Sequence, residues 1–260
     1  MSAPASREEL TRALEMLRAV ARQRSTEVLP VPGGEAMVNT QFPQAHDHNK
    51  VMVTTRCSAG ALATACDDIY GSRGMSHRLI EVHDVTLGEQ LADELRSSGY
   101  TGGHELLMAF AGKVVSSSSA LSIVELDVAE RAAVASADWR RDQPGWPEST
   151  VDQLGRRIAT ITDAARTAFL AVRDGDGSVA AHADLYLRDG VAQVEEVLTR
   201  SEARGRGLAS ALVLDAVQRA RNWGAELVFL IADAEDWPQE LYRKLGFVDL
   251  GRTVSLRRQS

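Results

Sequence analysis

The sequence predicts an α/β protein with two domains. Stretches rich in β-favouring residues alternate with amphipathic helical stretches along the whole chain, a pattern typical of α/β folds. The chain has 260 residues, of which 44% are hydrophobic, so it is long enough for two modest domains. A polar run from Ser116 to Ser119 separates two structured stretches. We therefore expect an N-terminal domain at residues 1–116 and a C-terminal domain at 120–260.

Helices and strands are expected in alternation along the N-terminal half. Apolar residues at helical spacing mark the helices, as where Leu62, Ala65 and Ile69 share one face. In chain order the elements are a helix at 8–23, a strand at 50–55, a helix at 59–70, a strand at 78–82, a helix at 87–97 and a strand at 106–110. This order is α/β in character.

The C-terminal half has a longer series of elements. They are a strand at 120–126, helices at 128–141 and 151–162, strands at 167–173, 178–187 and 191–199, and a helix at 209–223. The sequence Asp174-Gly175-Asp176-Gly177 is a strong signal for a hairpin between two of these strands. With a further strand, helix and strand at the end, the order becomes β-α-α-β-β-β-α-β-α-β.

The most distinctive segment follows the strand at 191–199. After Thr199 the chain enters the turn Arg204-Gly205-Arg206-Gly207 and then begins a long helix. A helix N-terminus binds anions, because its first N–H groups have no partner within the helix and its dipole favours negative charge. Glycines let a phosphate approach the backbone, and arginines pair with phosphate oxygens. The segment therefore predicts a phosphate-binding turn.

Two motifs in this half carry a family resemblance. Residues 204–209 fit the pattern R/Q-x-x-G-x-G/A and follow the stretch VEEVLT, and residues 241–247 read LYRKLGF. In these features residues 120–255 resemble the GNAT superfamily of N-acetyltransferases. The resemblance implies a mixed, mostly antiparallel sheet flanked by helices. The N-terminal half is compatible with a degenerate copy of this fold, giving a tandem protein. It lacks the motif, however, so an unrelated α/β domain is the alternative.

The resemblance implies acetyl-CoA as the acyl donor and no metal. In this family the strand at 191–199 splays from its neighbour and holds the pantetheine arm, and the N–H of Leu198 is our candidate for polarising the thioester carbonyl. The pyrophosphate would lie on the turn and the helix start. The expected cofactor-binding residues are Val197, Leu198, Thr199, Arg204, Gly205, Arg206, Gly207, Leu208, Ala209 and Ser210.

A carboxylate on the same strand is the expected catalytic base. Strand alternation places Gln193 and Glu195 on one face, and Glu196 and Leu198 on the other. Family bases often come from the positions of Gln193 and Glu195, so we expect Glu195 to take the proton of the amine, directly or through a water. A bulge in the strand would shift the alternation and favour Glu196. The alternative is that both glutamates are solvated on a face of the sheet and take no part in catalysis.

Tyr242 is the expected catalytic acid, because a phenol at this position can donate its proton to the departing thiolate. It lies on a helix that Asp236 can cap and that Gly246 ends. A tyrosine that only packs in the core is the alternative. Many family members carry an asparagine where this chain has Glu235. The acidic cluster at 233–236 therefore either lines the entrance for a basic substrate or forms a solvated loop.

Composition narrows the classes of function. The chain has 36 acidic and 29 basic residues and a net charge of −7, which disfavours nucleic-acid binding and fits a cationic substrate. The two cysteines, Cys57 and Cys66, exclude a disulfide scaffold and fit a reducing compartment such as the cytoplasm. No export signal and no membrane-spanning helix are expected. His46-Asp47-His48 predicts a polar loop rather than a metal site.

These observations together predict an acetyl-CoA-dependent N-acetyltransferase that acts on a small-molecule amine, with a homodimer left open. Two alternatives keep the fold. One is a non-catalytic acyl-CoA-binding sensor or scaffold, and the other is an acyltransferase that uses a longer acyl group. His182 stands alone in the sequence and is expected to be a surface or core residue. Trp139, Trp146 and Trp237 either wall a substrate pocket or pack near helix ends.

Overall fold

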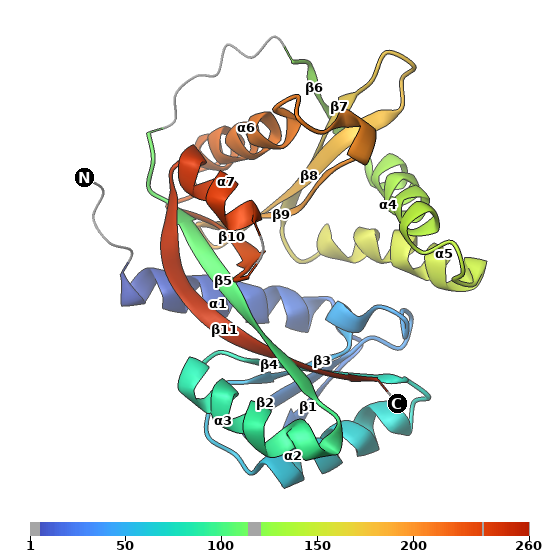
Figure 1. Cartoon of the computed structure of the whole chain (residues 1–260), viewed down its shortest axis with the longest axis vertical. Coiled ribbons are helices and arrows are strands. Elements are labelled where there is room, and N and C mark those ends of the chain that lie inside the picture. Colours follow the sequence, from blue (N-terminus) through green and yellow to red (C-terminus); the bar gives the residue numbers. More distant parts are fainter. Residues whose placement is uncertain (1–5, 114–120, 236, 260) are drawn as a thin grey trace. The chain divides into compact units, whose positions relative to one another are not determined.

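Helices and strands alternate along the chain as the sequence predicts (Figure 1). The computed structural model describes residues 6–113, 121–235 and 237–259. The helices are α1 Arg7–Gln23, α2 Ala59–Cys66, α3 Val85–Leu95, α4 Val128–Asp142, α5 Glu148–Arg156, α6 Leu208–Asn222 and α7 Pro238–Leu245. The strands are β1 Glu27–Val31, β2 Gly34–Val38, β3 Lys50–Val53, β4 His77–Val82, β5 Thr101–Phe110, β6 Ile123–Leu126, β7 Arg166–Arg173, β8 Val179–Arg188, β9 Val191–Thr199, β10 Leu227–Asp233 and β11 Phe247–Gln259. Each element expected from the sequence has a counterpart among them.

Strands β1 and β2 are not among the expected elements. They form an antiparallel hairpin in which Glu27 lies opposite Val38. Pro30 and Pro32 in this stretch argue against a strand, because proline cannot donate to the ladder. Pro30 is tolerated because β1 lies at the end of the strand order, where one side of the strand needs no partner, and Pro32 lies in the turn between the two strands. Gly33, with φ of +77°, makes the tight turn.

The described residues divide into two compact units. Unit 1 comprises Met1–Met16, Leu107–Ala232 and Asp236–Leu250, and unit 2 comprises Leu17–Leu106, Asp233–Glu235 and Gly251–Ser260. Strands β5 and β11 therefore contribute residues to both units. The serine run expected at the domain boundary lies outside the described residues.

In unit 1 the strands lie in the order β10-β9-β8-β7-β6. Strands β6 to β9 pair antiparallel, whereas β9 and β10 pair parallel. Figure 1 shows α6 on one face of these strands and α4 and α5 on the other. The sheet is thus mixed, mostly antiparallel and flanked by helices, as the resemblance implies.

Helix α6 forms close to the expected residues. Its inward face is made of buried apolar side chains at helical spacing: Leu212, Val213, Ala216, Val217 and Ala220. The helix follows Gly207, with φ of +75°, and the chain leaves it at Gly224, with φ of +88°. Glycine adopts this left-handed conformation without a steric cost. The N-terminus of α6 therefore follows the end of β9 after a short connection that contains the glycine turn.

In unit 2 the strands lie in the order β1-β2-β3-β4-β11, and the pairing is antiparallel except between β3 and β4. Helix α2 connects these two parallel strands, as α6 connects β9 and β10 in unit 1. Leu62 of α2, Ile80 of β4 and Leu91 of α3 lie in the buried core of the unit. The strand–helix–strand arrangement of unit 1 is therefore repeated in unit 2.

The two parallel pairs differ where the strands end. Val53 and Val82, the last residues of β3 and β4, still pair, and the N–H of His83 donates to the carbonyl of Val53 (3.1 Å). Unit 2 therefore has no opening between its parallel strands. Within the described residues, no helix combines the length and the apolar character that crossing a bilayer requires.

Candidate functional site

The parallel strands of unit 1 separate along their length. Residues Val191 to Val194 of β9 pair with Leu227 to Leu230 of β10, and β9 then continues to Thr199 beyond this pairing. The N–H of Arg200 donates to the carbonyl of Ala180 on β8 (3.0 Å). By the alternation of antiparallel hydrogen bonds, the N–H of Leu198 points toward β8 and that of Thr199 points into the gap. This direction argues against the expected role of the Leu198 N–H in polarising a thioester, and that role stays a prediction.

The glycine turn beside this gap has the geometry of an anion site. Gly205 and Gly207 both adopt left-handed conformations, with φ of +77° and +75°. The first hydrogen bond of α6 joins the N–H of Ala211 to the carbonyl of Gly207 (3.1 Å). The N–H groups just before Ala211 consequently have no acceptor within the helix, and no side chain caps this helix start. Free N–H groups and the helix dipole favour a bound anion.

A cavity of about 350 Å³, here called the donor cavity, connects the gap and the turn. Its lining residues are Val197, Leu198, Thr199, Ala203, Arg204, Gly205, Gly207, Leu208, Ala209, Ser210, Trp237, Pro238, Leu241 and Tyr242. All the expected cofactor residues except Arg206 are in this set. Arg206 does not line the cavity and instead pairs with Asp174 of the β7–β8 turn (2.7 Å). Among the described residues, no group hydrogen-bonds the buried Oγ1 of Thr199.

The expected site set did not include Ala203, Pro238 and Leu241, which also line the donor cavity, and it named Trp237 only as a wall for a substrate. Pro238 and Leu241 are one helical turn apart and next to Tyr242 on α7, so the same helix face carries all three. This spacing could have indicated them. Trp237 is 64% exposed, which is unusual for so large an apolar side chain.

Tyr242 is largely buried and lies in the wall of the donor cavity. Burial raises the pKa of Tyr242 above its usual value, so the phenol keeps its proton at neutral pH. Helix α7 begins with Pro238 and ends at Gly246, with φ of +102°. Asp236, the expected cap, lies outside the described residues. The assignment of Tyr242 as the acid stays a prediction, and the role of the acidic cluster at 233–236 does too.

A second cavity of about 130 Å³, here called the acceptor cavity, lies on the α4 side of β8 and β9. Its lining residues are Arg131, Ala135, Asp138, Trp139, Asp142, Arg157, Ile158, His182, Glu196 and Leu198. Leu198 lines both cavities. The two cavities therefore share one wall residue of β9.

Strand β9 contains a bulge beside the residue that the two cavities share. Asp184 of β8 lies opposite Glu195, but His182 lies opposite Leu198, so β9 has one residue more than β8 in this interval. Glu196 has φ of +52°, in the left-handed region. The simple alternation expected beyond Glu195 is therefore wrong, because the extra residue returns Leu198 to the face of Glu195. The choice between Glu195 and Glu196 as the base stays a prediction.

The bulge directs Glu196 into a cluster of buried arginines. Its carboxylate lies 3.9 Å from Nη2 of Arg131 and 3.3 Å from Nη2 of Arg157, although Glu196, like Glu195, is exposed. Arg131 also donates from Nε to Asp184 (2.7 Å), and both of these side chains are fully buried. Asp184 raises the pKa of Arg131 above its usual value, against the opposing effect of burial. The arginines of the acceptor cavity are thus matched by carboxylates.

His182 is a buried residue of this cavity and is 2% exposed. Its Nε2 lies 3.0 Å from Oδ2 of Asp138 on α4. The expectation of a surface or core residue is correct for its burial but missed this partner. The two residues are 44 positions apart and share no motif, so no local pattern in the sequence indicates the pair.

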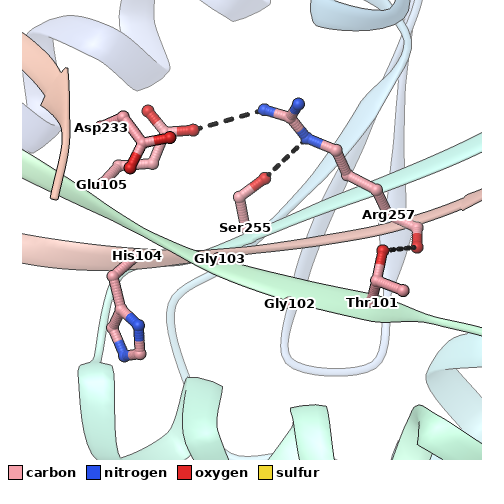
Figure 2. A pocket seen from close by; sticks show the side chains of 8 residues that line it. All are labelled: Thr101, Gly102, Gly103, His104, Glu105, Asp233, Ser255 and Arg257. Atoms are coloured by element: carbon pink, nitrogen blue, oxygen red, sulfur yellow. Dashed lines mark hydrogen bonds and ion pairs between the residues drawn. The ribbon is translucent and has the colours of Figure 1, made fainter. Parts of the chain in front are cut away.

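Unit 2 has a polar pocket of its own, formed by β5, β11 and Asp233. Figure 2 shows Glu105, Asp233 and Arg257 close together on one side of the strands, while His104 points to the other side. Arg257 lies 3.4 Å from Glu105 and is 66% exposed. Burial and the nearby charge of Glu81 raise the pKa of Glu105 above its usual value. None of the expected site residues lines this pocket.

Comparisons with known proteins agree with the geometry. Residues 131–247 match the acetyltransferase (GNAT) family. No curated protein matches the sequence. A functionally unknown conserved protein from Staphylococcus epidermidis is 13% identical with a TM-score of 0.72, over 91% of this chain and 94% of that chain. A GCN5-related N-acetyltransferase from Kribbella flavida is 19% identical with a TM-score of 0.63, over 96% of this chain and 94% of that one.

A tandem GNAT protein from the clavulanic acid biosynthesis pathway is 12% identical with a TM-score of 0.59, over 100% of this chain and 97% of that one. At such identities these likenesses show the fold, and here the fold extends over both units. The family match lies in the segment that carries the separated strands, the glycine turn and Tyr242. Residues 131–247 thus match the acetyltransferase (GNAT) family, and the whole chain is similar in fold to a tandem GNAT protein.

Proposed function

We propose that this protein is an acetyl-CoA-dependent N-acetyltransferase whose acceptor is the amine of a small cationic molecule. The observation that carries the proposal is that two cavities share Leu198 as a wall residue. One cavity has the anion site and the open strand edge that a CoA thioester needs. The other lies across β9 and carries ionisable groups. A thioester carbonyl held near Leu198 would then be reachable by an amine from the second cavity.

The donor cavity supports a CoA thioester through its two ends. At one end, the turn at Gly205 and Gly207 offers free N–H groups to the pyrophosphate. Toward the other, the backbone of Thr199 faces the gap that β10 leaves open, which suits the amide groups of a pantetheine arm. Arg204 lines the same cavity and adds positive charge for phosphate.

The proposed reaction needs an acid and a base. The neutral amine attacks the thioester carbonyl, a C–N bond forms, the C–S bond breaks, and the thiolate takes a proton from Tyr242. Its buried phenol suits this role because it is protonated at neutral pH. The sequence offers Glu195 and, after the bulge, Glu196 as carboxylate bases. Variants Glu195→Gln and Glu196→Gln distinguish them by which pH–rate profile loses its rising limb.

The charge of the acceptor cavity supports a cationic acceptor. Arg131 and Arg157 are paired with carboxylates, and Asp138 and Asp142 share Arg141 as a partner, so this group of side chains has one carboxylate in excess. A net charge of −7 on the chain also favours approach of a cation. The free thiols, Cys57 and Cys66, fit a reducing compartment, and we propose the cytoplasm.

A test of this function begins with mass spectrometry of the purified protein for a co-purified CoA species. Purified protein and acetyl-CoA are then incubated with a panel of polyamines, amino acids and aminoglycosides, and both released thiol and N-acetylated product are measured. Transfer to at least one amine supports the proposal. Tight acetyl-CoA binding without transfer to any amine would favour the acyl-CoA sensor, and preference for a longer acyl-CoA would change the donor.

A further inference from the structure

The acceptor cavity contains a buried histidine–carboxylate pair that the carboxylate-base hypothesis does not use. His182 projects from β8 and lies directly opposite Leu198 of β9, the residue that lines both cavities. Asp138 holds one ring nitrogen, Nε2, at 3.0 Å. Among the described residues, no group hydrogen-bonds the other nitrogen, Nδ1. One side of the imidazole is therefore fixed and the other is unoccupied.

The surroundings of Asp138 determine which nitrogen carries the proton. Nη1 of Arg141 donates to Oδ1 of Asp138 (2.8 Å), and His182 holds Oδ2. Burial by itself would raise the pKa of Asp138, but these hydrogen bonds hold that pKa below its usual value. An ionised carboxylate only accepts hydrogen bonds, so Nε2 of His182 must carry the hydrogen. In the neutral ring, Nδ1 then has a free lone pair.

We propose that His182, oriented by Asp138, is the residue that takes the proton from the acceptor amine. This inference rests on the proposed function. Nδ1 takes one proton from the ammonium group, and the resulting amine attacks the thioester. After the C–S bond breaks, Tyr242 protonates the thiolate. The nitrogen of the new amide then gives its extra proton to the Tyr242 phenolate, which becomes a neutral phenol again. One proton per turnover leaves His182 for solvent. Asp138 is a positioning residue, because it acts only through the imidazole.

The geometry favours His182 over the two carboxylates of β9. Both glutamates are exposed; Glu196 is already engaged by Arg131 and Arg157, and Glu195 does not line the acceptor cavity. His182, by contrast, has a fixed tautomer and a buried ring in the cavity wall. The charged groups around this cavity come from α4, the turn after α5, β8 and β9, and they are Arg131, Asp138, Arg141, Asp142, Arg157, Asp184 and Glu196.

The kinetic test compares acceptors that do and do not need to lose a proton before attack. With the best alkylamine of the panel, His182→Gln should lower kcat by about 10²–10⁴-fold and leave acetyl-CoA affinity unchanged in calorimetry. With hydroxylamine, which is neutral at the assay pH, the loss should be far smaller. Asp138→Asn should show the same pattern to a lesser degree. His77→Gln, a change of another buried histidine in unit 2, is the matched control and should keep wild-type rates.

Equal losses with both acceptors, or no loss, would overturn the base assignment. A wild-type protein that binds acetyl-CoA but acetylates no amine would contradict the proposed function itself. In that case, nitrogen NMR of histidine-labelled protein still tests the His182–Asp138 pair. The His182→Gln variant identifies the signal of His182 by its loss. We expect the hydrogen of the neutral ring on Nε2, and Asp138→Asn should disturb this tautomer. A neutral ring with its hydrogen on Nδ1 would overturn the inference.

Discussion

Replacing Gly207 by valine tests where the acyl donor binds. Gly207 lines the donor cavity and has φ of +75° at the start of α6. A Cβ at this position would meet no atom within 4 Å. The valine side chain would therefore extend into open space beside the helix N-terminus, where the phosphates of the donor are expected, rather than into the protein.

The expected magnitude has two parts. A left-handed conformation costs an L-residue about 1–2 kcal/mol, which should appear as a loss in the free energy of unfolding. The side chain should also keep phosphate away from the free N–H groups of the turn. Losing two charge-assisted hydrogen bonds of roughly 1.5–3 kcal/mol each removes about 3 kcal/mol or more of binding energy. That loss corresponds to at least about a 100-fold weaker affinity for acetyl-CoA.

Gly224→Val is the matched control. Gly224 has φ of +88°, its Cβ position is also open, and it follows the opposite end of α6. Urea denaturation should show similar losses of stability for both variants, whereas calorimetry should show weaker acetyl-CoA binding only for Gly207→Val. If Gly207→Val folds and binds acetyl-CoA with wild-type affinity, the donor site lies elsewhere. If Gly224→Val loses the same affinity, distortion of α6 explains the effect instead.

Tyr242→Phe should lower kcat by about 10²–10⁴-fold and keep acetyl-CoA affinity, because it removes the proton donor and retains the ring; a near-normal kcat would show that Tyr242 only packs. Calorimetry on the full chain should find one acetyl-CoA per chain, since β3 and β4 stay paired to their ends; two equivalent sites would contradict this. Arg131→Met should lower the free energy of unfolding in urea by about 3–5 kcal/mol, because it leaves Asp184 buried without its partner. Arg140→Met, which removes an exposed ion pair with Glu148, should change it little, and equal losses would refute the argument.

Much of the fold could be predicted from the sequence, because each element carries its own periodic signal. The stripe from Leu212 to Ala220 and the glycines at 207 and 224 predicted α6 close to its observed ends. The hairpin of β1 and β2 could not be predicted in this way. Two prolines there argue against a strand, and only the position of β1 at the end of the sheet makes Pro30 acceptable.

The two halves of the candidate site also differ in how far the sequence alone predicts them. Most of the donor half is contiguous in sequence, since strand, turn and helix start follow one another within residues 197–210, and local chemistry predicted the lining of this segment except Ala203. Arg206 was predicted there too but does not line the cavity, because its partner Asp174 comes from a different turn. A pattern of residues along the chain cannot show which distant side chain will form an ion pair with a charged residue such as Arg206.

The acceptor half was decided only by the tertiary structure. A single extra residue in β9 turns Glu196 toward Arg131 and Arg157, and this bulge depends on pairing with β8 rather than on the sequence of β9 alone. His182 gains its partner because α4 packs across the sheet and brings Asp138 to it from 44 positions away. By itself, the sequence determined the glycine turn and the helix behind it, because these depend on neighbouring residues. The groups that face an acceptor depend on strand register and helix packing, which bring together side chains that are far apart in the chain.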